Sequence, residues 1–314
     1  MKFRDNLNCG LNPSPSKKVV KRKFKNYTGL IYILPWIIGF VVFQLYPFIA
    51  TLFYSFTNYS LGRVPKFIGL KNYIDMFTND PYFFQAVKVT TIYVMMVVPL
   101  KLIFALFIAI ILNVKIKFVN FFRTIYYIPS ILAGSVTISI LWRALFVNDG
   151  LVNNLLSFFH IGQIQWLGSS LMALFTISML GVWQFGSSMV LFLAGLKQIP
   201  KELYEAGKVD GASKIRMFRI ITIPLLTPII FFNLIMQMIN AFQEFTSAFV
   251  VTNGGPMRGT YLFGMKLYEE AFKNFKMGYA SSLSWMLFLA IMVFTLLIFK
   301  SSSSWVHYED GGEF

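Results

Sequence analysis

Two stretches of this sequence contain no Asp, Glu, Lys or Arg, one from residue 26 to 62 and one from residue 150 to 196. A helix that crosses a bilayer needs about 20 mostly apolar residues, so each stretch is long enough for at least one such helix. Charged residues make up 13% of the chain, whereas soluble domains typically carry roughly 25%. Hydrophobic residues make up 56%, which excludes a disordered chain. The sequence therefore predicts an all-α membrane protein.

The apolar runs predict six membrane-spanning helices within one domain over residues 29–300. Lys101 lies near the middle of the second run and Arg143 near the end of the third. The uncharged stretch that begins at residue 150 is too long for one helix, and residues 157–170 are expected to form a loop within it. Prolines inside or at the ends of the runs indicate kinks or helix ends. The expected spans cover residues 29–56, 87–114, 124–147, 171–196, 220–251 and 277–299.

Lys and Arg are distributed unevenly between the two sides of the membrane that six spans would define. One side holds more than twice as many basic residues as the other. It comprises the tail over residues 1–28, the loops after the second and fourth spans, and Lys300. Because cytoplasmic loops carry the excess of basic residues, both termini are predicted to be cytoplasmic, including a tail over residues 301–314. Topology and contact with membrane lipid then explain the net charge of +15, and no nucleic-acid partner is expected.

The loop over residues 197–223 is longer and more patterned than the other basic loops. Pro200 suits the start of a helix over residues 201–208. Asp210 suits the N-cap of a second helix, whose apolar periodicity covers residues 213–221. Ala206, Gly207 and Gly211 are small enough to let another surface approach the backbone closely. An ordinary helical hairpin at the membrane interface fits the same features.

This loop resembles the signature loop of the permease subunits of ATP-binding-cassette (ABC) importers. In that family Glu-Ala-Ala is followed by three residues, Gly, nine residues and Ile-x-Leu-Pro. Here Glu205-Ala206-Gly207 precedes Gly211 and the sequence from Ile221 to Pro224 at the same spacings. Gly207 stands where the family has its second Ala, and Ile223 stands where it has Leu. The Gly lowers helix propensity by about 1 kcal/mol relative to Ala.

Other segments along the chain resemble the carbohydrate-importer branch of that family, which includes maltose permeases. They are Phe67-Ile-Gly-Leu-x-Asn-Tyr73, Trp142-Arg-x-Leu-Phe146, Gly195-Leu-x-x-Ile-Pro200, Leu203-Tyr-Glu-Ala206, Asp210-Gly-Ala212 and Asn253-Gly-Gly-Pro256. The resemblance implies the six-helix fold of type I ABC importer permeases in a bacterial plasma membrane. It also implies a sugar as the solute, in particular an oligosaccharide.

The resemblance further implies a multi-subunit transporter. Two permeases, this chain and a second homologous subunit, would form the pathway, two ATPase subunits would bind ATP and Mg, and an extracellular binding protein would deliver the sugar. The chain has no G-x-x-x-x-G-K-[ST] loop of its own, so no enzyme activity, catalytic residue or cofactor is expected in it. The implied ATPase-coupling residues are Glu205, Ala206, Gly207, Asp210 and Gly211.

Polar side chains within the apolar runs are candidates for solute contact, because such groups are costly in lipid and usually face a cavity or another helix. Gln237, Asn240 and Glu244 are spaced to share one helix face. The stretches that contact solute in the sugar importers correspond to those that hold the candidates. Hydrogen bonding between helices is the alternative for each. The substrate-binding candidates are Trp183, Gln184, Ser188, Gln237, Asn240 and Glu244.

Lys101 is a separate candidate, because it is a charge deep within a span. It could face an acidic solute, pair with Glu244 or extend its amine towards the membrane interface. The two histidines, His160 and His307, lie outside the spans, and no metal site is expected.

Three other functions compete with a sugar importer. A permease of the same superfamily could carry another solute, such as a phosphorylated polyol. An ion-coupled carrier would need an internal repeat and several buried ionisable groups, and the sequence shows neither. A membrane enzyme would need clustered His, Cys or carboxylates, which are sparse here.

Overall fold

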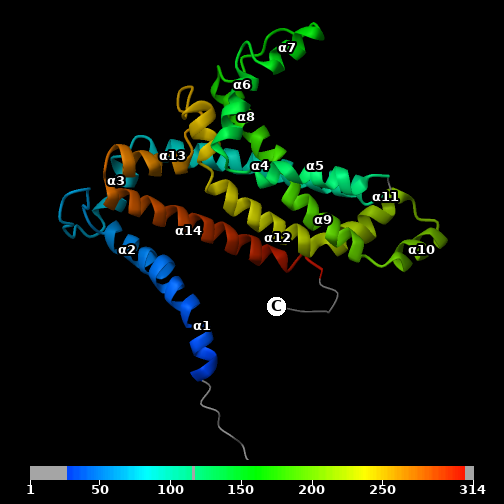
Figure 1. Cartoon of the computed structure of the whole chain (residues 1–314), viewed down its shortest axis with the longest axis horizontal. Helices are drawn as coiled ribbons and strands as arrows, with labels where there is room; N and C mark the ends of the chain where they lie inside the picture. The colour runs from blue at the N-terminus through cyan, green and yellow to red at the C-terminus, as the bar shows by residue number, and fades with distance from the viewer. Residues whose placement is uncertain (1–26, 115–116, 308–314) are drawn as a thin grey trace, which may run out of the picture. The chain divides into compact units, whose positions relative to one another are not determined.

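The computed structural model describes residues 27–114 and 117–307 (Figure 1). These residues belong to two compact units, one that reaches Ile49 and one that begins at Ala50. Almost all of the basic tail expected over residues 1–28 lies outside the described residues, as does the part of the carboxyl-terminal tail from residue 308 to 314. The described part of the chain contains no strand, only an isolated bridge between Thr57 and Phe67.

The first predicted span is one helical run with a π-helical turn inside it. The run consists of α1 (Tyr27–Phe40), η1 (Val41–Leu45) and α2 (Tyr46–Ser55), and it is long and apolar enough to cross a membrane. The backbone N–H of Tyr46 donates to the carbonyl of Val41, five residues back. Pro47, the next residue, has no N–H to donate, so the helix cannot continue with regular bonds at this point.

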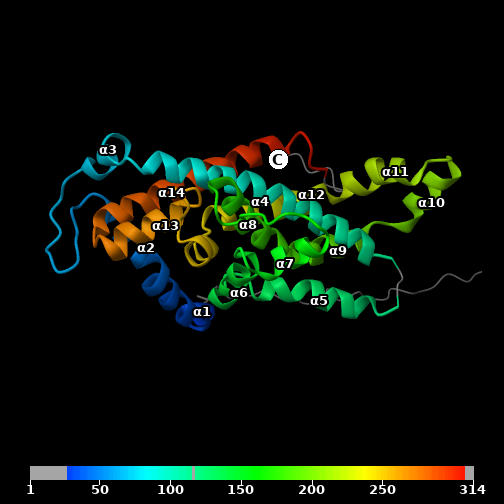
Figure 2. The ribbon, with the colours of Figure 1, turned by 90° about the horizontal axis from the view of Figure 1, so that it is seen from above.

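Helix α4 (Phe83–Leu112) is the central element of the second unit. It packs against α8 (Ser170–Trp183), α9 (Gly186–Gln198) and α12 (Ile223–Phe242), and Figure 2 shows it running beside them. Small side chains bring these helices close together. A Cβ on Gly181 of α8 would lie only 3.0 Å from the hydroxyl of Tyr93 and 3.1 Å from Val97 Cγ1, both on α4. Close packing of small residues is a usual source of helix association in membranes.

The third predicted span is not one straight helix. It consists of α5 (Val119–Ile131) and α6 (Val136–Phe146), and α6 with the following α7 (Leu151–Phe158) turns by 100° from α5. The chain leaves the helix at Gly134, which has a φ of +73° that side chains with a Cβ rarely adopt. The fourth span, α8 and α9, bends by 44° at its break. Among the described residues, four helices are long and apolar enough to cross a membrane, or up to six spans if each bent pair is one span.

The fifth span ends earlier than the sequence predicts. It runs through α11 (Lys214–Met217), η2 (Phe218–Thr222) and α12, which ends at Phe242 rather than near Val251. A separate π-helical turn, η3 (Ala248–Thr252), follows. The sixth span, α14 (Met277–Ser302), contains the predicted helix and extends a few residues beyond it.

The end of the second unit near the start of α14 contains a buried ionic network that the sequence did not predict. Here α3 (Lys71–Thr78) leads to Asp80, and α13 (Phe263–Tyr268) with η4 (Glu269–Lys273) precedes α14. Lys266 is 1% exposed, and its Nζ lies 2.6 Å from Asp80 Oδ2 and 3.6 Å from Glu270 Oε1. The Tyr279 hydroxyl also donates to Asp80. Lys266 is therefore a buried structural residue and not a loop cation.

Candidate functional site

Three helix breaks meet around one polar cavity of about 460 Å³, which we call the polar cavity. Gly134 lies at the break between α5 and α6, Gln184 at the break between α8 and α9, and Gln243 just beyond α12. Ser130 joins the first two breaks, because its hydroxyl donates to the Gln184 carbonyl at 3.2 Å and accepts from the Ser187 N–H at 2.9 Å. Broken helices expose backbone donors and acceptors that a polar solute can use.

The side chains around this cavity are mostly uncharged and polar. Of the predicted solute contacts, Gln184, Gln237, Asn240 and Glu244 lie here, and so does Lys101 from α4. Sequence reasoning missed Tyr93 and Ser130, because an aromatic or hydroxyl side chain in an apolar run gives no signal of its own. The polar and charged side chains that line it are Tyr93, Lys101, Ser130, Gln184, Ser187, Gln237, Asn240, Gln243, Glu244 and Thr246.

Glu244 reaches the cavity from outside α12, not from its helical face. It lies two residues beyond the end of α12, and its Oε1 accepts hydrogen bonds from the N–H (2.9 Å) and hydroxyl (2.8 Å) of Ser247. These bonds fix the carboxylate at the start of η3, where the free N–H groups of a helix favour negative charge. No carboxylate of the described residues lies within 4.0 Å of Lys101 Nζ, so Glu244 and Lys101 form no ion pair.

Trp183 and Ser188, the other two predicted solute contacts, do not line the cavity. The Trp183 ring packs against the Trp142 ring, with centroids 5.8 Å apart. Ser188 is fully buried, and its hydroxyl has no hydrogen-bond partner in the described structure. The helix breaks between Trp183 and Gly186. Trp183 and Ser188 therefore do not share one helix face with Gln184.

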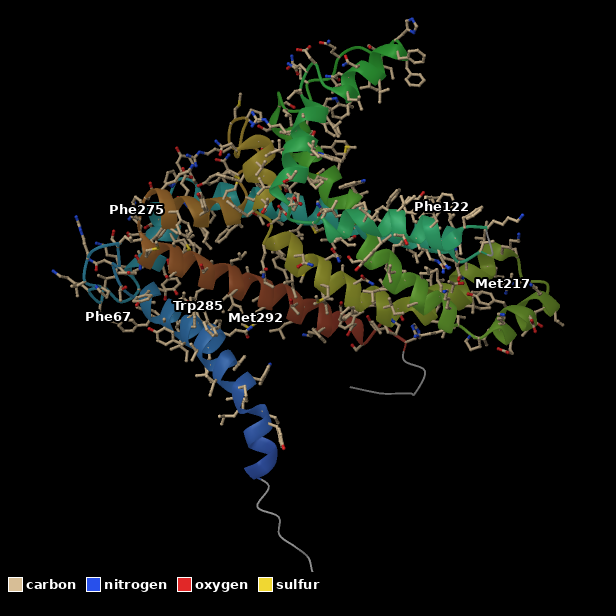
Figure 3. The ribbon with its side chains drawn as sticks, viewed as in Figure 1. Phe67, Phe122, Met217, Phe275, Trp285 and Met292 are labelled. Carbon is tan, nitrogen blue, oxygen red and sulfur yellow. The ribbon has the colours of Figure 1, made fainter. Side chains whose placement is uncertain are left out.

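The predicted loop over residues 197–223 forms a helical hairpin, here called the α10–η2 hairpin. Helix α10 (Lys201–Val209) ends at Asp210, which is its C-cap and not the N-cap of the next helix as the sequence suggested. Ser213 is that N-cap, since its hydroxyl accepts from the N–H of Arg216. Figure 3 shows Met217 in this hairpin, at the far end of α12 from Phe275.

Gly211 closes α10 with a Schellman motif. The N–H of Gly211 donates to Lys208 O at 3.0 Å, and that of Ala212 donates to Gly207 O at 2.8 Å. Gly211 has a φ of +72°, and no atom lies within 4 Å of the position a Cβ would take. The positive φ, and not crowding, is therefore what requires glycine in this chain.

The hairpin presents a surface of small and apolar groups. Glu205, Ala206, Asp210 and Gly211 are exposed, and Gly207 is half-buried. A groove of about 290 Å³ lies between α10 and η2, and the two limbs are joined by a 2.8 Å hydrogen bond between the hydroxyls of Tyr204 and Thr222. The groove is lined by Leu203, Ala206, Gly207, Asp210, Ala212, Arg216, Met217, Ile220 and Ile221.

Comparison with known proteins agrees with this architecture. Residues 16–303 match the family described as "Binding-protein-dependent transport system inner membrane component". A probable ABC transporter permease protein, YesP of Bacillus subtilis, is 50% identical over 92% of this chain and 94% of its own length. The lactose transport system permease protein LacF of Rhizobium radiobacter is 33% identical over 90% and 96%.

The fold is shared with a solved structure. A chain of a bacterial alginate ABC transporter, in complex with an alginate pentasaccharide-bound periplasmic protein, matches with a TM-score of 0.75. The match covers 88% of this chain and 94% of that one at 21% identity, so it shows the fold.

Proposed function

Because the chain belongs to the family of inner-membrane components of binding-protein-dependent transport systems, and so is a subunit of an ABC transporter and not an enzyme, we propose that it forms part of the pathway of an ATP-driven oligosaccharide importer. In this proposal the polar cavity holds the sugar during its passage through the membrane. The energy is supplied by separate ATPase subunits.

The observation that carries the proposal is the polar cavity at the meeting point of three broken spans. Its volume of about 460 Å³ falls in the range of roughly 300–1,000 Å³ that is usual for pockets of drug-sized ligands. Amides and hydroxyls such as Gln237, Asn240 and Tyr93 both donate and accept hydrogen bonds, as the hydroxyl groups of a sugar require. The lactose permease relative and the alginate transporter support a saccharide as the solute.

The α10–η2 hairpin is the proposed contact with an ATPase subunit. A short helix whose carboxyl end is closed by the Gly211 turn can move as a rigid body, and the small residues Ala206, Gly207 and Gly211 let it fit closely against a partner. ATP and Mg would be held by two ATPase subunits. A second homologous permease would complete the pathway, and an extracellular binding protein would deliver the sugar, as the periplasmic protein bound to the alginate transporter suggests.

The distribution of basic residues gives the proposed orientation. With both termini in the cytoplasm, the α10–η2 hairpin faces the cytoplasm, and the loops around α13 face the outside. The hairpin lies where cytosolic ATPases can reach it. The polar cavity lies between the cytoplasmic and outer ends of the spans, among α4, α8–α9 and α12.

Purification and reconstitution of the assembled transporter tests the proposal. We expect the permease to co-purify with an ATPase, and vesicles that contain the complex and its binding protein to accumulate an oligosaccharide only when ATP is supplied. Saccharides that co-purify with the binding protein would identify the solute by mass spectrometry. Transport by the isolated chain without ATP would overturn the proposal.

A phosphorylated polyol remains the second candidate, and Lys101 is the observation that favours it. A phosphate could pair with this amine in the polar cavity. Competition of sugar uptake by glycerol phosphate separates the two, since only a polyol phosphate permease would show strong inhibition.

A further inference from the structure

Lys101 is a charged group in the middle of a membrane-spanning helix without an ionic partner among the described residues. It lies in α4, a helix of 30 residues, and its side chain lines the polar cavity. A lysine at such a position costs about 2.5–3.5 kcal/mol or more to place in a bilayer, so it normally pairs with another group or faces water. No carboxylate of the described residues lies within 4.0 Å of its Nζ.

Among the described residues, Glu244 is the one carboxylate that lines the same cavity, and Ser247 donates two hydrogen bonds to it. The two hydrogen bonds from Ser247 hold its Oε1 at the start of η3. Because these bonds hold the Glu244 carboxylate more than 4.0 Å from Lys101 Nζ, the amine is left to pair with the charge of a solute.

From this geometry, and resting on the proposed function, we infer that the transported oligosaccharide is acidic and that Lys101 binds one of its carboxylates. The remaining amides and hydroxyls of the cavity would bind the neutral hydroxyl groups of the same sugar. The cavity is larger than a single phosphate or a three-carbon polyol phosphate requires, which favours a sugar acid over the phosphate alternative.

A second pocket in the same unit is lined by more cations than carboxylates. It has a volume of about 250 Å³, and Arg258, Lys273 and Glu269 are the charged groups that line it. The Tyr261 hydroxyl donates to Glu269, and both burial and this carboxylate raise the pKa of Tyr261, so the phenol keeps its proton. Lys273 has no carboxylate within 4.0 Å among the described residues. This pocket, here called the Arg258 pocket, also suits an anionic sugar.

Aromatic side chains connect the two sites. Phe245 lines the polar cavity and Phe249 lines the Arg258 pocket, and their rings are stacked with centroids 5.1 Å apart. The Tyr268 ring lies 5.0 Å from the first and 5.3 Å from the second. Aromatic faces offer apolar contact to the C–H faces of sugar rings without binding the carboxylate. They would therefore let an acidic sugar pass between Lys101 and the Arg258 pocket.

The test uses the reconstituted complex with its binding protein and matched sugar probes. Trisaccharides of galacturonate, glucuronate and mannuronate are each compared with their fully methyl-esterified forms, which have the same rings and no charge. Maltotriose and glycerol 3-phosphate are the neutral and phosphate probes. We expect ATP-driven uptake of at least one uronate trisaccharide and at least about tenfold less uptake of its ester.

The variants show whether Lys101 causes that preference. We expect Lys101→Met to reduce uptake of the acid at least about tenfold and Lys101→Arg to retain most of it, because arginine also pairs with carboxylates. Lys88→Met is the matched control, since Lys88 is an exposed lysine on the same helix outside the cavity. Glu244→Gln, alone and combined with Lys101→Met, tests whether Lys101 acts only by balancing the charge of Glu244. If Lys101 serves only Glu244, the double variant recovers transport.

Each outcome decides between the two proposals. Preferential uptake of the acid that depends on Lys101 and not on Lys88 supports the inference. Equal uptake of acid and ester, preference for the neutral or phosphate probe, or recovery in the double variant overturns it and leaves the permease function intact. Absence of ATP-driven uptake of every probe, together with failure to co-purify with an ATPase, overturns the proposed function instead.

Discussion

At the scale of single residues, Gly207 occupies a position with room for a methyl group. A Cβ there would lie 3.4 Å from Met217 Cγ and Sδ and 3.5 Å from Ile221 Cδ1, which are ordinary contact distances. Since Gly inside a helix costs about 1 kcal/mol relative to Ala, we expect Gly207→Ala to stabilise α10 by up to that amount and to leave transport unchanged. Thermal unfolding of the purified complex and ATP-driven uptake measure the two effects.

Gly207→Leu is the control for size at the same position. A leucine cannot fit against Met217 without displacing it, so the control should weaken the hairpin and reduce ATP-driven uptake. A loss of stability in the alanine variant would show that α10 packs too closely against Met217 and Ile221 to admit a methyl group.

Lys266 provides a second prediction, because its charge is buried and paired. Replacement of one member of a buried pair leaves the other without compensation, so Lys266→Met should destabilise the protein by about 3–5 kcal/mol. Lys266→Met with Asp80→Asn removes the two closest charges, leaves Glu270, and should recover a large part of that loss. Thermal unfolding of the two variants decides the point. If the double variant is no more stable than the single one, Lys266 contributes through packing and not through charge.

The same pair predicts how stability depends on pH. Burial alone raises the pKa of Asp80, but hydrogen bonds from Lys266, Tyr279 and the Tyr82 N–H, together with the Lys266 charge, hold that pKa below its usual value. A lowered pKa stabilises the fold above the unfolded value of about 3.9, and this contribution is lost as the pH falls through the folded pKa. The wild type should therefore lose more stability than the double variant on acidification below about pH 4.

At the scale of helices and turns, the interior π-turns of two spans share one local cause. In η1 the Tyr46 N–H donates to Val41, and Pro47 follows. In η2 the Ile223 N–H donates to Phe218, and Pro224 follows. A proline has no N–H, so the carbonyls before it lose their regular partners, and the preceding turn widens. The sequence predicted a kink or a helix end at these prolines, and the structure shows a π-helical turn before each one.

Gly211 tests the α10–η2 hairpin as an element. The Schellman motif needs a residue with positive φ, so Gly211→Asn, which tolerates that conformation, should retain most of the transport activity. Gly211→Val should reduce uptake strongly, because a β-branched side chain opposes the turn and also adds bulk to the proposed ATPase contact. Co-purification of the ATPase and uptake are measured for both. Normal assembly and transport by the valine variant would show that this turn is not needed for coupling.

The sequence predicted where helices exist better than where they break. Apolar length determined the six spans, because the cost of polar groups in lipid leaves little choice. The break at Gly134 depends on one backbone angle, and the end of α12 depends on Glu244 bonding to Ser247 instead of continuing the helix. Asp210 and Ser213 both suit an N-cap by residue type, and only the position of the Schellman turn decides between them.

At the scale of the whole chain, the polar cavity depends on contacts that no local pattern predicts. Helical spacing predicted that Gln237, Asn240 and Glu244 share one helix face. All three line the cavity, but Glu244 lies beyond the end of α12 and not on its face. Ser130, Gln184 and Gln243 lie there only because three breaks, far apart in sequence, meet at the same level of the second unit. The resemblance pointed to the stretches before Gly195 and Asn253, and the fold determines which of their side chains line the polar cavity.

The predicted membrane orientation can be tested with two exposed positions, one in the α10–η2 hairpin and one in the loop between η3 and α13. Val209 is 89% exposed and Met257 is 91% exposed. In a background with Cys9→Ser, each is replaced by cysteine and treated with a membrane-impermeant maleimide. If both termini are cytoplasmic, Met257→Cys is labelled in intact cells, whereas Val209→Cys is labelled only in inside-out vesicles. The reverse pattern would contradict the orientation inferred from the basic residues. Excess ATPase subunit should then slow labelling at Val209→Cys and leave labelling at Met257→Cys unchanged, because only the hairpin is proposed to contact the ATPase.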